Sequence, residues 1–185
     1  MAGERFVMRR IRAIIFVLVA LPALIVLVVV SIGAFLPSQH ISTRAARFLQ
    51  PPTAIWQAIT DYEKFPAWRK DVVKVEALPD LNGKPVWREF DRHGGSIPFQ
   101  VLVMVPPRAL VTRIADPKLP FGGTWTYEIS SQADGSSLLR ITEDGETYNP
   151  IFRFAARFVL GYSRTQEQYL RALGAKFGQS VTIEK

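Results

Sequence analysis

Cysteine is absent from the 185 residues, and only two histidines occur, His40 and His93. The lack of cysteine excludes disulfides, thiolate nucleophiles, thiolate-ligated zinc, iron–sulfur clusters and cysteine-linked lipids. Two histidines are too few for a multi-histidine metal site, so the sequence predicts neither a metal nor a cofactor. The length is that of one domain of ordinary size, because domains usually have about 100–200 residues.

Sequence motifs of common enzymes and of nucleic-acid-binding proteins are also missing. The chain has no G-x-S-x-G elbow, Walker loop, H-E-x-x-H or dinucleotide glycine pattern, so hydrolase, nucleotide-binding and metalloprotease functions lack support. The net charge of +7 divides into +3 for Met1–Arg12 (four basic residues minus one acidic) and +4 for Pro37–Lys185 (19 minus 15). This mild excess is not interleaved with exposed aromatic residues, so nucleic acid is not an expected partner.

One long apolar run is present, Ala13–Leu36, with 24 consecutive uncharged residues. As a helix it would be about 36 Å long, enough to cross a hydrocarbon core of about 30 Å with some tilt. The alternative is a cleaved signal, whose apolar region should have only about 7–15 residues followed by a small-x-small site, which Ile32-Gly33-Ala34 matches poorly. We therefore predict a retained transmembrane helix over residues 13–36, in which Pro22 is tolerated.

Basic residues indicate the orientation of this helix. Four arginines precede it, and only two basic residues lie within roughly the first fifteen positions after it. Because cytoplasmic flanks carry the excess of basic residues, we expect the N-terminus in the cytoplasm and the rest of the chain outside it, in the periplasm of a cell with two membranes. The predicted parts are a basic cytoplasmic tail (1–12), the transmembrane helix (13–36), a short linker (37–39), one domain (40–178) and a C-terminal tail (179–185).

The domain after the linker is predicted to consist mainly of short strands separated by turns. Asn82-Gly83 is a strong hairpin signal, and Trp125, Tyr127 and Ile129 share one face of the most regular strand. Two short helical pieces, residues 53–60 and 61–70, follow the first strand. The seven segments with a strand pattern are residues 40–48, 72–78, 85–92, 99–105, 110–115, 124–130 and 138–143.

A long amphipathic helix is predicted from Asn149-Pro150 to Phe177-Gly178, with proline in its first turn and a glycine stop. At about 100° per residue, one side collects Ile151, Ala155, Phe158, Tyr162, Tyr169 and Leu173. The opposite side collects Arg153, Arg157, Arg164 and Arg171. Such a helix must cover the inner face of the sheet, and one helical layer on one antiparallel sheet predicts an α+β fold.

The order of one strand, two short helices, six strands and a long helix resembles the helix-grip fold of the START-like superfamily, also called SRPBCC or polyketide cyclase/dehydrase-like. The residues that carry the resemblance are PPTAIWQAITDYEKFPAWRKDV, GGTWTYEI, LLRITEDGETYNP and FRFAARFVLGYSRTQEQYLRALGAKFG, within His40–Gly178. The resemblance implies a curved antiparallel sheet of about seven strands around the last helix, with a hydrophobic cavity between them. Members bind lipids, sterols, polyketides, hormones or quinones, and some catalyse cyclisation or hydrolysis in the cavity.

Within such a fold, the inward-facing apolar residues are the candidates for a ligand-binding cavity. The alternative is that they only fill a core, as aromatic residues at strand or helix spacing usually do. The predicted cavity residues are Phe99, Val101, Val103, Trp125, Tyr127, Ile129, Leu139, Ile141, Phe154 and Phe158.

No catalytic site is predicted, and the candidates for an acid or base are two residues, Glu143 and Tyr148. Glu143 shares the parity of Leu139 and Ile141, which predicts that it points into the cavity near Tyr148 as an acid or base. The alternative is that Glu143 lies at the sheet edge and pairs with an arginine. His93 lies in a glycine turn and is expected to be exposed. Whether the protein is an enzyme stays open, with binding favoured over catalysis.

The four arginines of the long helix have two interpretations, contact with anionic headgroups or a solvated helix face. Together these observations favour a membrane-anchored protein that binds a lipid or isoprenoid-like molecule in an extracytoplasmic helix-grip domain. Two alternatives are a cyclase- or hydratase-like enzyme acting in the same cavity and a protein-interaction module of the cell envelope.

Overall fold

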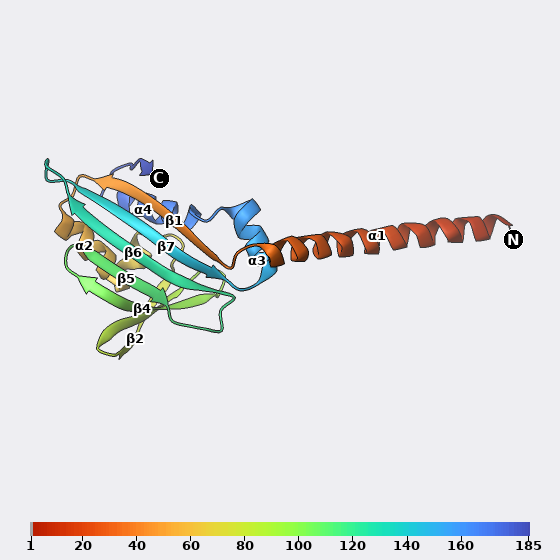
Figure 1. Cartoon of the computed structure of the whole chain (residues 1–185), viewed down its shortest axis with the longest axis horizontal. Helices are drawn as coiled ribbons and strands as arrows, with labels where there is room; N and C mark the ends of the chain where they lie inside the picture. Colours follow the sequence, from red (N-terminus) through yellow and green to blue (C-terminus); the bar gives the residue numbers. More distant parts are fainter. Residues whose placement is uncertain (1) are drawn as a thin grey trace.

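The structure is a computed structural model (Figure 1). It describes the backbone of residues 2–185 and the side chains of Arg9 and of residues 15–185. A single helix projects from a domain built of one curved sheet and several short helices. The elements follow in the order α1 (Ala2–Phe35), β1 (Gln39–Phe48), α2 (Pro52–Thr60), the 3₁₀ helix η1 (Tyr62–Ala67), β2 (Lys74–Leu81), β3 (Lys84–Phe90), β4 (Ser96–Val105), β5 (Ala109–Ile114), β6 (Phe121–Ser131), β7 (Ser137–Thr147), α3 (Pro150–Ala155), the π-helix η2 (Ala156–Leu160), α4 (Arg164–Lys176) and β8 (Ile183–Glu184).

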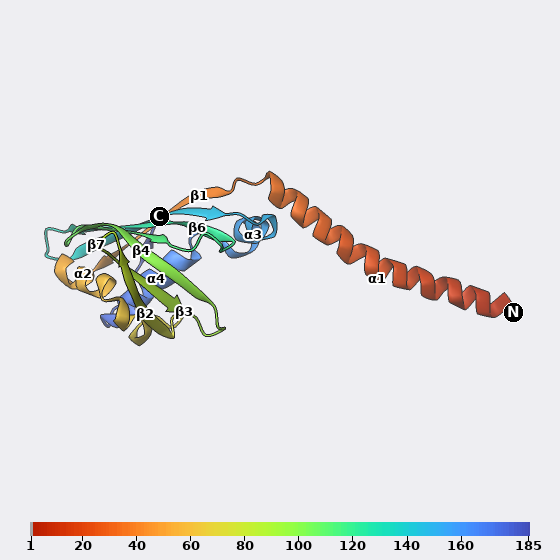
Figure 2. The ribbon, with the colours of Figure 1, turned by 90° about the horizontal axis from the view of Figure 1, so that it is seen from below.

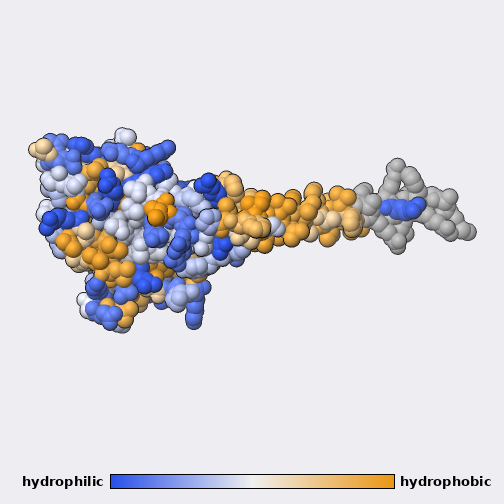
Figure 3. All heavy atoms as spheres, in the orientation of Figure 1, coloured by the Kyte–Doolittle hydropathy of each residue, from blue (hydrophilic) through white to orange (hydrophobic). Residues whose placement is uncertain are grey.

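The helix α1 carries the apolar run and extends it backward over the basic tail. Its segment Ile15–Phe35 has 21 residues with a mean hydropathy of 3.2, and it is almost entirely exposed, with Gly33 as its buried residue. Figure 3 shows this segment as a hydrophobic rod that leaves a domain of mixed polarity. By length and composition, the segment fits a membrane anchor or a signal sequence.

All strands of the sheet pair antiparallel, in the order β2-β3-β4-β5-β6-β7-β1-β8. The meander from β2 to β7 follows from the turn residues, since Asn82 (φ 55°) and Gly83 (φ 70°) both adopt the left-handed conformation that a two-residue hairpin needs. β1 pairs with β7 over ten residues, so the first strand after α1 lies next to the last long strand. The predicted seven strands are confirmed, and β8 adds a short eighth strand within the predicted C-terminal tail.

The helices α2 and α4 pack against the concave face of the sheet (Figure 2). Ile55 and Ile59 of α2 and Leu170 and Leu173 of α4 are fully buried, because each pair is spaced so that both side chains lie on one face of its helix. Gln166 fixes α4 to the sheet, since its side chain accepts from the Ser42 hydroxyl (2.8 Å) and donates to the Ser42 carbonyl (2.8 Å). The predicted α+β helix-grip fold is thereby confirmed.

The prediction of one continuous helix from residue 149 to 178 is wrong. Gly161 adopts a left-handed conformation (φ 75°) that ends η2, and α4 begins anew at Arg164. Only α4 grips the sheet, while α3 packs against the end of α1. Because of this break, the four arginines predicted to share one face do not form a single stripe.

Candidate functional site

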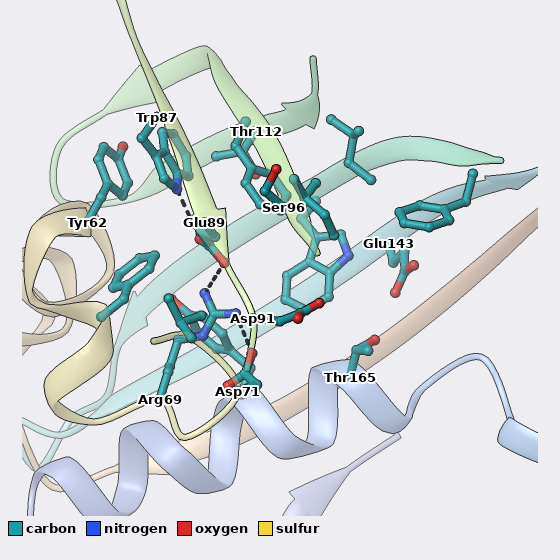
Figure 4. Close-up of a pocket in the computed structure, with 18 of the residues that line it drawn as sticks. Tyr62, Arg69, Asp71, Trp87, Glu89, Asp91, Ser96, Thr112, Glu143 and Thr165 are labelled. Carbon is teal, nitrogen blue, oxygen red and sulfur yellow. Dashed lines mark hydrogen bonds and ion pairs between the residues drawn. The ribbon is translucent and has the colours of Figure 1, made fainter. Parts of the chain in front are cut away.

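A cavity of about 440 Å³ lies between the concave face of the sheet, η1 and α4 (Figure 4). The strand alternation creates its wall, because one face of β3 to β7 points inward along the whole meander. Its apolar and aromatic lining includes Ile59, Tyr62, Phe65, Val72, Trp87, Phe90, Ile97, Phe99, Leu110, Ile114, Phe121, Trp125, Tyr127 and Tyr169. Its polar lining includes His40, Arg69, Asp71, Glu89, Asp91, Ser96, Thr112, Glu143, Glu146, Thr147, Thr165 and Gln168.

The cavity lies toward the end of the sheet from which α1 departs. Its lining includes His40 near the start of β1, Phe121 at the start of β6 and Thr147 at the end of β7. β1 begins only four residues after the end of α1, so these strand ends are the ones nearest to the helix. The exposed lining residues mark the entrance, and they are Asp71, Asp91, Gly95, Thr165 and Gln168.

A buried ionic cluster forms one wall. Arg69 donates from Nη1 to Glu89 Oε2 (2.9 Å) and from Nη2 to Asp71 Oδ2 (2.6 Å), and its side chain is only 14% exposed. Trp87 donates its indole N–H to the other oxygen of Glu89 (3.0 Å), as the dashed lines in Figure 4 show. Burial disfavours charge on Arg69, but the carboxylates of Glu89 and Asp71 outweigh it and raise the pKa of the guanidinium.

Glu89 is the member of this cluster whose charge burial disfavours most clearly. Burial raises the pKa of its carboxyl, and the favourable contacts with Arg69 and Trp87 offset that shift only in part. The Arg69 Nε atom is buried without a hydrogen-bond partner among the described residues. The cluster therefore retains a donor that a ligand oxygen can satisfy.

Stacked aromatic rings extend the wall from this cluster. Trp87 lies between Tyr62 (ring centroids 3.8 Å apart) and Phe99 (5.5 Å). Burial raises the pKa of Tyr62 to about 12, so its hydroxyl stays protonated at neutral pH. This hydroxyl has no hydrogen-bond partner among the described residues, which makes it a second free donor beside the cavity.

A second polar group lies nearer to α1. Glu143 Oε1 is 3.7 Å from His40 Nε2, and the His40 ring stacks on Tyr162 (4.1 Å). A Cβ at Gly145 would collide with the His40 ring, so the glycine lets that ring lie against β7. Glu143 Oε2 is buried without a partner in the described part of the chain, and the residue lines the cavity as its strand parity predicts.

Within the residues that the structure describes, Glu143 does not pair with an arginine, and Tyr148 does not line the cavity. Among the described residues, the ionic neighbour of Glu143 is His40 and not an arginine. Tyr148 is 47% exposed and donates its hydroxyl to Glu146 (2.5 Å), so it does not accompany Glu143 in the cavity. The chain turns away after β7, which carries Tyr148 out of the strand parity. His93 is exposed in its turn, as expected.

Of the ten predicted cavity residues, Phe99, Trp125 and Tyr127 line the cavity. Four others are buried in the core behind it and do not line it, namely Val101, Ile129, Leu139 and Ile141. For these four, the alternative of simple core packing describes their position.

The remaining three predicted cavity residues lie elsewhere, and their assignment is corrected. Val103 is 43% exposed because the β4–β5 register shifts between Val101 and Val103, which reverses its parity. Phe154 and Phe158 follow α3 away from the sheet, and Phe158 is 59% exposed. Phe154 contacts Phe158 (4.9 Å) instead of the cavity wall.

Sequence reasoning missed the ionic cluster and the polar residues His40 and Thr112. One signal for Glu89 was present, since it shares strand parity with Trp87 and so falls on the inward face. A charged residue at such a position needs a buried partner. No local pattern indicated that the partner is Arg69, because the two residues meet only through the tertiary fold.

The comparisons with known proteins agree with this architecture. Residues 40–177 match the family described as polyketide cyclase / dehydrase and lipid transport. No curated protein sequence matches the chain.

Two solved structures illustrate the shared fold. A START superfamily protein from Mycobacterium smegmatis is 18% identical, with a TM-score of 0.61 over 74% of this chain and 96% of that one. The Zhui aromatase/cyclase from Streptomyces sp. R1128 is 15% identical, with a TM-score of 0.61 over 73% of this chain and 91% of that one. The chain belongs to the polyketide cyclase / dehydrase and lipid transport family.

Proposed function

We propose that the protein is a single-pass membrane protein whose START-like domain, outside the cytoplasm, binds a lipid or isoprenoid-like molecule. The observation that carries the proposal is the cavity. Its volume of about 440 Å³ falls within the roughly 300–1,000 Å³ typical of small-molecule sites. Its walls combine aromatic and aliphatic side chains with polar groups, and the Arg69–Glu89 pair is held in place by ionic contacts. Apolar walls with fixed polar groups can bind an apolar ligand and orient its polar end.

The free donors indicate what the ligand carries. Arg69 Nε and the Tyr62 hydroxyl are buried and unsatisfied among the described residues, and both residues line the cavity. A carbonyl or hydroxyl oxygen on the ligand would satisfy them, and pairing a buried donor recovers about 1–3 kcal/mol. The proposed ligand is therefore an apolar molecule with an oxygen function that lies beside Arg69.

The membrane part of the proposal rests on α1. Its apolar segment of 21 residues is about 31 Å long, close to the roughly 30 Å of a hydrocarbon core. The excess of arginine before this segment favours a cytoplasmic N-terminus. With the cavity near the α1 end of the sheet, a lipid would have a short path between bilayer and binding site.

The test is mass spectrometry of the molecules that co-purify with the full chain. The Thr112→Phe substitution fills the cavity, because Thr112 is buried on β5 and lines it. Thr126→Phe is the matched control on β6, where the alternation places Thr126 on the other face from Trp125. We expect a stoichiometric hydrophobic molecule with the wild type and Thr126→Phe, and its loss with Thr112→Phe. Equal amounts with all three folded proteins would contradict the proposal, because lipids around α1 would then account for everything bound.

Catalysis in the same cavity is the second candidate, and the Glu143–His40 pair favours it. A carboxylate and an imidazole 3.7 Å apart beside a ligand can take up and return a proton. Glu143→Gln keeps the size of the side chain and removes this capacity. If the domain is an enzyme, Glu143→Gln will retain an unconverted ligand whose mass differs from that of the wild-type ligand. Identical masses would favour binding alone.

A further inference from the structure

We propose that α3 and η2 lie in the membrane interface beside α1 and hold the domain against the bilayer; this inference rests on the proposed role of α1 as a membrane anchor. The surface concerned, here called the α3–η2 surface, is apolar and open to solvent. Its five large apolar side chains are Ile151 (47% exposed), Phe152 (50%), Phe158 (59%), Val159 (70%) and Leu160 (53%). In a water-soluble domain, such a dense group of exposed apolar side chains marks an interaction site.

The position of this surface along α1 determines its depth. α3 packs directly on the end of α1, where a Cβ at Gly33 would collide with the backbone of Pro150. Arg153 strengthens the junction, since it donates to the carbonyl of Leu36 (3.3 Å) and to that of Thr147 (2.8 Å). The apolar segment of α1 ends at Phe35, so Gly33 lies only about 3 Å inside that end. A segment that touches Gly33 must then lie at the level of the hydrocarbon edge.

A bilayer fits this surface better than a protein partner does. The α3–η2 surface begins at α3, which packs on α1, and the same end of α1 carries the exposed apolar side chains Ile32 (40%) and Phe35 (92%). Those side chains already face acyl chains when α1 spans the membrane. Arg157 is exposed within η2 and can extend its guanidinium to the headgroups, as basic residues do at membrane interfaces.

This arrangement has a consequence for the cavity. Thr147 lines the cavity and lies just three residues before α3 begins at Pro150. Seating α3 and η2 in the interface would therefore hold the α1 end of the cavity near the lipid surface, because three residues of chain span at most about 10 Å. The domain would act on molecules at the bilayer rather than on molecules dissolved far from it.

The absence of native cysteine allows a direct test in full-length protein reconstituted in phosphatidylcholine/phosphatidylglycerol vesicles. Single cysteines at Phe158 and Val159 are labelled with the environment-sensitive fluorophore NBD, and the vesicles contain doxyl-labelled lipids that quench it. Leu24→Cys, in the middle of the apolar segment, is the positive control. Asp134→Cys, in the β6–β7 turn at the opposite end of the strands, is the negative control. Intrinsic tryptophan fluorescence verifies that each variant is folded.

We expect lipid quenching at residues 158 and 159 to be at least half of that at residue 24, and quenching at residue 134 to stay at background. If lipid quenching at residues 158 and 159 does not exceed the background while residue 24 is quenched, this inference is overturned, and the proposed role of α1 as an anchor still holds. Shielding of 158 and 159 from aqueous iodide without lipid quenching would also overturn it, because a second copy or another protein would then cover the surface. Background quenching at residue 24 would refute the anchor itself, and the inference with it.

Discussion

The Arg69–Glu89 pair allows the sharpest energetic prediction. Both side chains are at least 86% buried, since they are 14% and 10% exposed, and Arg69 keeps a second carboxylate at Asp71. Removing one partner of a buried ion pair typically costs about 3–5 kcal/mol, because the other charge remains uncompensated. We expect Glu89→Gln to lower the free energy of unfolding by about 3 kcal/mol, near the lower limit, because Asp71 still faces the guanidinium.

The complementary substitution should behave differently with pH. In Arg69→Met, the uncompensated group is Glu89, whose carboxyl already has a raised pKa from burial. At a pH between the ordinary carboxyl pKa and the raised pKa, Glu89 is protonated in the folded variant and ionised in the unfolded chain. The folded variant therefore binds the extra proton, and its stability rises as the pH falls. The cost of Arg69→Met should therefore shrink between pH 7 and pH 5, whereas the cost of Glu89→Gln should not, because arginine stays charged.

Urea unfolding of the full chain in detergent micelles, followed by tryptophan fluorescence, measures both effects. The double variant should cost less than the sum of the single variants by about 2 kcal/mol. The exposed pair Arg47–Asp134, with side chains 53% and 64% exposed, is the control, and its coupling should be much smaller than that of Arg69 and Glu89, because water screens exposed charges. Additive costs at Arg69 and Glu89, together with no pH dependence for Arg69→Met, would refute the cluster as described.

Three further perturbations have defined outcomes. Gln166→Ala removes a fully buried amide that joins α4 to β1, so it should lower the free energy of unfolding by about 1–3 kcal/mol in urea titrations; an unchanged midpoint would contradict this. Burial raises the pKa of Tyr127 and of Tyr169, so stability should fall as the pH rises above about 10 and the unfolded chain loses these protons first. Absorbance at 295 nm should then rise in two steps, an early one from exposed tyrosine such as Tyr148 and a later one that coincides with the loss of circular dichroism. Ionisation of all five tyrosines without unfolding would count against it. Gly33→Leu should separate Pro150 from α1. A protease should then cut near residue 149 faster than in the control Gly33→Ala, because the smaller alanine side chain displaces the backbone less.

The parts of the fold that the sequence predicted are those with local causes. Trp125, Tyr127 and Ile129 follow the alternation of a regular strand, and Asn82-Gly83 favours one hairpin turn, so both features can be recognised from a few neighbouring residues. The apolar run in α1 is equally local. These signals suffice for the order from β2 to β7, because a meander follows directly from consecutive hairpins, but they do not place β1 beside β7.

The parts that could not be predicted depend on distant contacts. Gly161 resembles any helical glycine in the sequence, and only the packing of α3 on α1 shows why the helix ends there. The bulge before Val103 reverses the parity of one strand end without any proline or glycine at that position. Arg69 and Glu89 meet through the fold of the η1 region against β3, so neither residue alone predicts the other.

The central claim is that the cavity itself, and not only the surface of α1, takes up a hydrophobic molecule. Photo-crosslinking tests this most directly, with a diazirine-bearing fatty acid added to membranes that contain the full chain, followed by peptide mapping of the adducts. The account predicts adducts on β5 and β6 between Leu110 and Tyr127, and their loss in Thr112→Phe but not in Thr126→Phe. Adducts confined to α1 and the α3–η2 surface would contradict it, because the cavity would then hold no such ligand.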